Sequence, residues 1–237
     1  MGRITKEKFK VYKNVFDNFT EQTLNKLSSQ GHFEELKSPI FVGKESNVFL
    51  ASKRSEFVIV KIYRLESCDF NKMFDYIKSD IRYPNIKKQR RRVIFAWVQR
   101  EYRNLMIARE GKVNVPTPLI FLNNILVLQL IGDNAPAPRL KDKIPKNKKL
   151  FFKKVLENMK KLNKAGLVHG DLSEYNILNY REEPYFIDFS QSTLIKNPGS
   201  EELLKRDVKN IARYFKKIGL ETSEAEIIEK IKCTNTK

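Results

Sequence analysis

The chain of 237 residues is 41% hydrophobic and contains 16 Phe, so it can bury the core of one large domain or of a two-lobed unit. Its 46 Lys and Arg outnumber its 28 Asp and Glu, and the net charge of +18 favours polyanionic partners such as nucleotides or RNA, although a Lys-rich surface adopted for solubility would look the same. Two Cys and two His without metal-ligand spacing argue against a disulfide-rich fold and against a zinc site. The sequence has no apolar signal core and no apolar run of roughly 18 residues, so it predicts a cytoplasmic protein that does not enter a membrane.

The N-terminal residues predict a helix. Aromatic residues recur at three- and four-residue spacing from Phe9 through Tyr12 to Phe19, which gives one apolar face. Gly31 is the kind of residue that ends a helix. Residues 1–32 are therefore expected to form a helical extension ahead of the main fold.

A small sheet with one helix is expected next. Short β-type runs bounded by turn residues occur at 39–42, 48–51, 57–63, 119–122 and 125–130. Apolar residues at helical spacing predict a helix over 93–109. Residues 65–92 combine weak periodicity, dense charge and Pro84, so a long mobile loop is expected there. Residues 33–131 would then form a first lobe.

Residues 132–237 predict a second lobe that is compact and mainly helical. The Pro-rich segment 132–138 has the composition of a boundary between lobes. Apolar periodicity predicts helices over 146–165, 201–218 and 223–231, with two short strands between the first and the second. The chain as a whole therefore predicts an α+β fold.

Residues 167–192 constrain the chemistry most tightly. Asp171 is followed five positions later by Asn176, and a second carboxylate, Asp188, comes directly after an apolar run. Phosphoryl-transfer enzymes place a base and the ligands of Mg²⁺ in this order. Asp171 would orient an attacking hydroxyl or water, and the oxygens of Asn176 and Asp188 would hold the metal. Each residue alone could instead cap a helix, satisfy a turn or end a strand, but the joint spacing favours a shared site.

Lys61 lies inside an apolar strand, where an unpaired ammonium group would be costly. A phosphate and a carboxylate on a helix would both satisfy its charge. Glu101 in the helix predicted over 93–109 is the expected partner, although Glu110 lies in the same region. A surface Lys and a solvated Glu are the plain alternative.

Two further segments fit a nucleotide. The turn 43–47 precedes the Lys61 strand, so its backbone N–H groups and the Ser46 hydroxyl could contact phosphate oxygens, although a simple hairpin turn would look similar. Residues 126–132 would connect the lobes, with backbone groups of Gln129 and Ile131 facing an adenine edge. The basic run 87–92 is either a solvated face or a surface that neutralises RNA phosphates.

Taken together, these residues resemble the RIO family of atypical protein kinases, most closely its type-one branch. The matching segments run in order along the chain and are 43–48, 60–63, 101–105, 131–132, 136–140, 169–176, 187–192 and 206–207. The resemblance implies a two-lobed protein-kinase-like fold, with a small β-sheet N-lobe, a compact C-lobe and residues 33–237 as one RIO-type kinase domain.

The resemblance also implies an activity and partners. It implies an ATP-dependent serine/threonine protein kinase and ATPase that uses Mg²⁺, with Mn²⁺ as a substitute. The residues implied for the nucleotide are Gly43, Lys44, Glu45, Ser46, Asn47, Val48, Lys61, Gln129 and Ile131. Members of the family autophosphorylate on serine and can hydrolyse ATP through a phospho-aspartate, for which Asp188 has the matching position. The implied partners are ATP and a pre-small-ribosomal-subunit particle of rRNA and ribosomal proteins, with the chain as a monomer or weak homo-oligomer.

The chain also departs from the family pattern. Phe41 and Val42 stand where the type-one pattern usually has Ser-Thr, which removes two hydroxyl groups near the expected phosphates. The type-two branch carries a winged-helix domain ahead of its kinase core. The 42 residues that precede Gly43 are too few for such a domain, and the short C-terminal tail resembles archaeal members.

Two other functions stay open at this point. A small-molecule phosphotransferase of the aminoglycoside-kinase type shares the motifs at 169–171 and 187–189, but such enzymes bind cationic substrates in acidic pockets, whereas this chain is strongly basic. A nucleotide-switched module that binds a ribonucleoprotein would keep the fold without depending on turnover. The presence of every catalytic carboxylate argues against an inactive protein.

Overall fold

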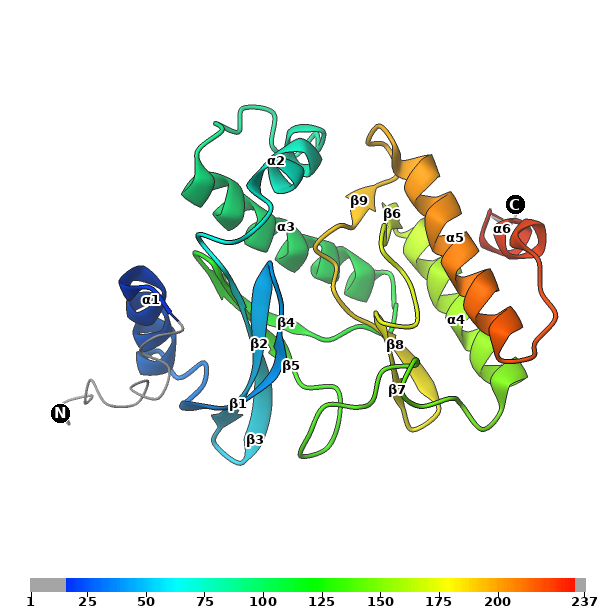
Figure 1. Ribbon diagram of the computed structural model, residues 1–237, viewed down its shortest axis with the longest axis horizontal. Coiled ribbons are helices and arrows are strands. Elements are labelled where there is room, and N and C mark those ends of the chain that lie inside the picture. The colour runs from blue at the N-terminus through cyan, green and yellow to red at the C-terminus, as the bar shows by residue number, and fades with distance from the viewer. Residues whose placement is uncertain (1–15, 233–237) are drawn as a thin grey trace.

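The computed structural model describes residues 16–232 and has two lobes side by side (Figure 1). The elements in chain order are α1 (Asn18–Ser29), β1 (Glu35–Val42), β2 (Ser46–Lys53), β3 (Glu56–Tyr63), α2 (Phe70–Lys78), α3 (Arg90–Glu110), β4 (Pro118–Leu122), β5 (Ile125–Gln129), α4 (Lys148–Lys164), β6 (Leu167–Val168), β7 (Ile177–Tyr180), β8 (Glu183–Phe186), β9 (Thr193–Leu194), α5 (Ser200–Lys217) and α6 (Glu224–Lys232). The α+β, kinase-like architecture predicted from the sequence is confirmed. The part of the N-terminal helix predicted from Phe9 and Tyr12 lies outside the described residues.

The first lobe is built on a five-stranded antiparallel sheet of order β1-β2-β3-β5-β4. Side chains of directly paired residues point to the same face of a sheet. One face carries Phe49, Val60 and Val127 and packs on α1. The other face carries Val48 and Lys61 and looks toward α3 and the second lobe. The register therefore decides which strand residues can take part in a site between the lobes.

The loop expected over 65–92 is wrong in two places. Residues Phe70–Lys78 form α2, and α3 begins at Arg90, three residues before the predicted start. The Asp69 side chain caps α2 by accepting a hydrogen bond from the backbone N–H of Lys72 at 3.1 Å. Met73 and Ile77, four positions apart, bury one face of this helix against α3. Two apolar positions are too few to reveal a nine-residue helix, so the packing against α3 decides its existence.

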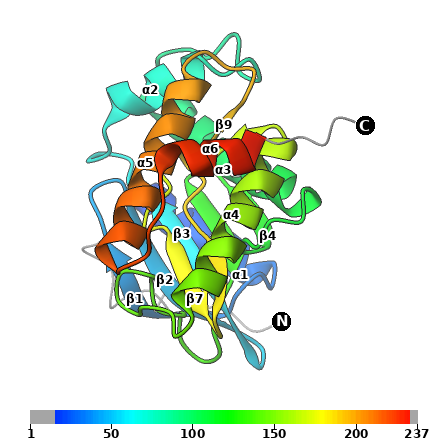
Figure 2. The same ribbon diagram turned by 90° about the vertical axis from the view of Figure 1, so that its right-hand side faces the viewer.

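The second lobe consists of a layer of helices packed against two small β-ladders. Helix α6 lies across α4 and α5, with which it makes contact (Figure 2). The predicted helices over 146–165, 201–218 and 223–231 match α4, α5 and α6 within two residues at each end. β6 pairs with β9 and β7 pairs with β8, which fixes the loops that carry Asp171 and Asp188 between them. No helix within residues 16–232 combines the length and the apolar character needed to cross a bilayer.

Candidate active site

The centre of the site is the Lys61 ammonium group, which lies between two carboxylates. Its Nζ atom is 2.8 Å from Oε1 of Glu101 in α3 and 2.9 Å from Oδ1 of Asp188, which follows β8. The hydroxyl of Tyr63 donates a hydrogen bond to the other oxygen of Glu101. Glu101 is thus the carboxylate that contacts Lys61, and Glu110 lies at the exposed end of α3. The first lobe supplies Lys61 and Glu101, and the second supplies Asp188.

The charges of this cluster stabilise one another. Burial by itself would lower the pKa of Lys61, but the neighbouring Asp188 and Glu101 carboxylates raise the pKa well above its usual value, so the group is a cation. Burial opposes ionisation of Asp188 as well, yet the Lys61 charge and its hydrogen bond hold the Asp188 pKa at about 2. The Asp188 side chain is 41% exposed, so this ionised carboxylate remains open to a ligand.

Asp171 and Asn176 form the second part of the site. The side-chain amide of Asn176 donates to the backbone carbonyl of Asp171 at 2.8 Å and to its Oδ2 at 3.1 Å. Because both bonds use the amide nitrogen, the amide oxygen of Asn176 is left as an acceptor. Burial, followed by repulsion from Asp188, raises the Asp171 pKa above its ordinary value. A raised pKa makes this carboxylate a better proton acceptor.

Asp207 of α5 fixes the backbone around Asp171 through two hydrogen bonds. The Asp207 carboxylate accepts hydrogen bonds from the N–H groups of Gly170 at 2.8 Å and Leu172 at 2.7 Å, one on each side of Asp171. Gly170 has φ +80° and a Cβ at this position would lie 2.9 Å from the carbonyl oxygen of Gln191, so glycine suits the close approach. Asp207 belongs to one of the segments that match the family pattern, but its position under the catalytic segment follows only from the fold.

The segment after Asp188 is held from the other side by α3. Arg100, fully buried, donates from Nη1 to the carbonyl of Ser190 at 2.8 Å and from Nε to Asp80 at 2.8 Å. The amide of Asn104 donates to the carbonyls of Phe189 at 3.2 Å and of Ser192 at 2.8 Å. These bonds fix the turn in which Asp188 itself has φ +63°.

Sequence reasoning missed Arg100, and it included Asn104 in the matching segment 101–105 without giving it a role. Both fall among the apolar residues that α3 buries, at the three- and four-residue spacing of its inner face. A charged or amide side chain at such a position needs a buried partner. That signal could have marked them as residues with structural partners, but it could not have identified which carbonyl groups they contact.

The turn 43–47 lies at the edge of the site, and its residues differ in whether their side chains face the site. The N–H of Gly43 donates to the carbonyl of Ser46 at 3.0 Å, which closes the turn, while Lys44 is exposed. Burial raises the pKa of Glu45 above its ordinary value, and Lys72 of α2 partly offsets this. The side chain of Asn47 points to the α1 face, where it accepts from Arg64 at 3.1 Å, so it is turned away from Lys61. Val48, paired with Lys61, lies on the face toward the site.

The connection between the lobes offers two backbone groups. The N–H of Gln129 donates to Thr117, and the carbonyl of Ile131 accepts from Ala137, both at 2.8 Å. The carbonyl of Gln129 and the N–H of Ile131 are used by neither bond. The Gln129 side chain turns back to bond with Thr117, so its identity matters little to a ligand at this connection.

The donor set suits a hard divalent cation. Within residues 16–232, no three His, Cys, Asp or Glu side chains gather closely enough to hold a metal by themselves. The available oxygens are the carboxylate of Asp188 and the amide oxygen of Asn176. Mg²⁺ commonly takes one or two protein oxygens and completes its shell with water and substrate phosphates. Two hard oxygen donors, one of them on a partly exposed carboxylate, therefore fit Mg²⁺ bound together with a phosphorylated ligand.

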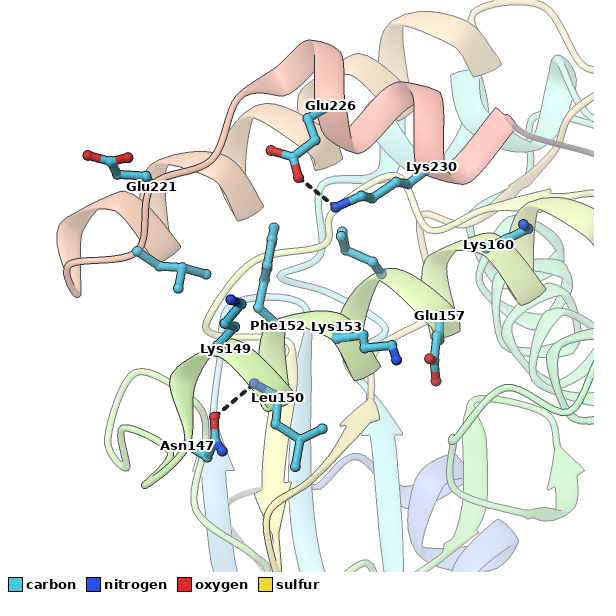
Figure 3. Close-up of a pocket in the computed structure, with 12 residues that line it drawn as sticks. Asn147, Lys149, Leu150, Phe152, Lys153, Glu157, Lys160, Glu221, Glu226 and Lys230 are labelled. Carbon is cyan, nitrogen blue, oxygen red and sulfur yellow. Dashed lines mark hydrogen bonds and ion pairs between the residues drawn. The ribbon is translucent and has the colours of Figure 1, made fainter.

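A separate groove of about 650 Å³ lies in the second lobe between α4 and α6 (Figure 3). Its walls combine apolar side chains such as Phe152 with several Lys and Glu, including the ion pair of Glu226 with Lys230 at 2.5 Å. None of the residues of the Lys61 centre lines it. The groove is therefore a feature of the helical lobe and not part of the candidate active site.

Comparisons with known proteins agree with this geometry. The RIO domain family model matches residues 47–228. The chain is 39% identical to the RIO-type serine/threonine-protein kinase Rio1 of Haloferax volcanii over 225 residues, covering 94% of this chain and 78% of the relative. It is 43% identical to the Rio1 kinase of Methanocaldococcus jannaschii, covering 89% and 73%.

Solved structures agree on the fold. The crystal structure of the Chaetomium thermophilum Rio2 kinase in an ADP/Mg²⁺-phosphoaspartate complex matches with a TM-score of 0.71 at 21% identity, covering 92% of this chain and 67% of that one. The family match and the relatives carry the assignment beyond the fold. The chain belongs to the RIO family of serine/threonine-protein kinases.

Proposed function

We propose that this chain is an ATP- and Mg²⁺-dependent serine/threonine protein kinase with ATPase activity. The observation that carries the proposal is the Lys61 ammonium group held between Glu101 and Asp188, beside the Asp171–Asn176 pair. A fixed cation next to two oxygen donors and a base provides the positioning and electrostatic stabilisation on which phosphoryl transfer depends. Residues 33–131 and 132–237 would be the two lobes of one kinase domain.

Each residue of the centre has one proposed task. Lys61 binds phosphate oxygens and is oriented by Glu101. Asp188 and Asn176 supply oxygens to Mg²⁺, or to Mn²⁺ in its place, and the metal neutralises phosphate charge when bound. Asp171 accepts the proton of the attacking hydroxyl or water, a task that its raised pKa favours.

The remaining nucleotide contacts are proposed from the backbone. The Gln129 carbonyl and the Ile131 N–H would receive the adenine edge. The turn from Gly43 to Val48 would cover the phosphates through Lys44, Glu45, Ser46 and the backbone of Asn47, whose side chain faces away. Val48 lies on the face of the sheet toward the ligand.

Asp188 is also the proposed acceptor of a phosphoryl group. The Chaetomium thermophilum Rio2 kinase was solved as an ADP/Mg²⁺-phosphoaspartate complex, and the Asp188 carboxylate here is ionised and partly exposed. In the proposed step, a carboxylate oxygen forms a bond to the γ-phosphorus while the bond to the ADP oxygen breaks. Water then attacks the phosphorus and restores the carboxylate, which gives net ATP hydrolysis. Transfer to a serine of the chain would be the corresponding autophosphorylation.

The proposed macromolecular partner is a pre-small-ribosomal-subunit particle. The run 87–92 is exposed at the start of α3, and three of its cations lie over aromatic rings. These pairs are Lys88 over Phe74 at 5.3 Å, Arg90 over Phe70 at 5.3 Å and Arg91 over Phe19 at 4.9 Å. Side chains held in this way lose less freedom when they neutralise phosphates. We propose a cytoplasmic monomer or weak homo-oligomer that uses this run on the particle.

The test follows the γ-phosphate of labelled ATP in the presence of Mg²⁺. Label is expected as free phosphate, as an acid-stable hydroxyl ester and as a labile acyl phosphate. Asp171→Asn and Asp188→Asn should each reduce turnover at least about 100-fold. Asp142→Asn, the same change at an exposed carboxylate, should leave turnover unchanged. Wild-type turnover in both site variants would contradict the proposal.

A second experiment separates a working enzyme from a binding module. Single-turnover ATP cleavage is measured with and without pre-small-ribosomal particles. An increase with particles is expected for an enzyme that works there. If Asp188→Asn instead binds the particle tightly and releases the particle at the wild-type rate, the result would favour a module that uses nucleotide only as a switch.

A further inference from the structure

Phe41 is an exposed aromatic residue on the face of the sheet that looks toward the site. It lies near the end of the edge strand β1 and pairs with Val48, which in turn pairs with Lys61. Alternation therefore places these three side chains on one face. Phe41 is 45% exposed, so part of its ring is open to solvent. Its neighbour Val42 pairs with Asn47 and points to the opposite face.

The ring of Phe41 contacts Arg139 of the second lobe. The guanidinium carbon of Arg139 lies 5.2 Å from the ring centroid, within the range of a cation–π contact. Arg139 follows the connection between the lobes and is bridged to Leu178 of β7, so its backbone belongs to the second lobe. The connection between β5 and α4 lies between the sheet and β7 (Figure 1). The contact therefore joins the two lobes.

The same ring covers the turn proposed for the phosphates. A Cβ atom on Gly43 would lie 2.6 Å from the ring carbon Cε1 of Phe41, so the ring packs directly on the backbone of this turn. Phe41 thus touches the turn on one side and Arg139 on the other. Among residues 16–232, no carboxylate lies within ion-pair distance of Arg139, and the guanidinium group faces the ring of Phe41.

We propose that Phe41 and Arg139 form an outer wall of the nucleotide cleft that holds bound nucleotide and slows its release. The proposal rests on the nucleotide binding proposed above. Ser and Thr, the usual residues of the family pattern at positions 41 and 42, are too short to reach Arg139 in this way. Parting of the lobes would break this contact, so in this proposal the contact adds to the barrier to release. These are positioning residues and take no part in the chemistry.

The test measures the release of a fluorescent ADP analogue with Mg²⁺ from the full chain, chased with excess ATP in a stopped-flow instrument. Phe41→Ala should accelerate release about two- to fivefold, the change that loss of one exposed cation–π contact produces. Val42→Ala is the matched control, since it is the same truncation one position away on the opposite face and adds no hydroxyl group, and it should leave the rate unchanged. Phe41→Tyr should retain slow release.

A mutant cycle tests the pair. Arg139→Gln should accelerate release as much as Phe41→Ala, and the double variant should release no faster than either single variant. Release from Phe41→Ala at the wild-type rate, or additive effects in the double variant, would overturn the wall while leaving nucleotide binding intact. Absence of any analogue binding by the unmodified chain would overturn the proposed function as well, so the two failures are distinguishable.

Discussion

Replacement of Arg100 by Met tests whether α3 holds the segment that carries Asp188. The Arg100 side chain is fully buried and makes two polar contacts, with the Asp80 carboxylate and with the Ser190 carbonyl, both at 2.8 Å. Met fills a similar volume but offers no donor. The variant therefore leaves a buried carbonyl without its partner and weakens the neutralisation of a buried carboxylate.

The size of the effect follows from these contacts. Removing one partner of a buried ion pair costs about 3–5 kcal/mol. Asp80 keeps three hydrogen bonds from Arg82, two from its side chain and one from its backbone N–H. One nitrogen of Arg100 is buried without a partner, so removing that nitrogen is favourable. Both features place the cost at the lower end, about 3 kcal/mol of the free energy of unfolding. For a chain of this size the melting temperature should fall by roughly 6–12 °C.

The assay is urea denaturation, with Arg82→Met as the control. Arg82 contacts the same carboxylate, but its side chain is 16% exposed and Arg100 stays in place. Arg82→Met should lower the free energy of unfolding by at least about 1 kcal/mol less than Arg100→Met does, because an ion pair that is partly exposed to solvent contributes less to stability. Equal destabilisation by the two variants, within about 0.5 kcal/mol, would refute the reasoning that burial and the Ser190 bond set the cost.

Two further predictions concern the buried His169 and the Lys61 pair. Burial lowers the His169 pKa from 6.5 to about 4 in the folded chain, so its neutral form is favoured and stability is complete above pH 6.5. The contribution of His169 to the free energy of unfolding should fall by about 3 kcal/mol as the pH drops from 6.5 to 4, at ~1.4 kcal/mol per pKa unit. Urea titrations at several pH values should show this contribution as the difference in pH dependence between the unmodified chain and His169→Gln. Lys61→Met and Glu101→Gln should each lower kcat/KM for ATP about 100-fold, and the double variant little further, because the two residues act as a unit. Steady-state assays that gave multiplied losses would show that they act independently.

Much of the fold could be predicted because it depends on local pattern. Apolar alternation located β2 and β3, and helical periodicity located α3 and α4 within three residues. The candidate site was predictable for a similar reason. Asp171 and Asn176 lie five positions apart in one segment, so local geometry brings them together. Lys61 predicted a carboxylate partner on a helix because a buried ammonium group needs an opposite charge nearby.

The chain by itself thus specifies which residues form strands, helices and short-range motifs, since a period of two or of 3.6 residues is written in neighbouring positions. Only the tertiary structure decided that Phe70–Lys78 is helical, that Asp207 supports Asp171, that the Asn47 side chain faces away from Lys61 and that Phe41 reaches Arg139. These features depend on contacts between residues far apart in sequence or on which face of the sheet becomes buried. Neither is encoded in a local window, because both are settled when the lobes and the sheet pack together.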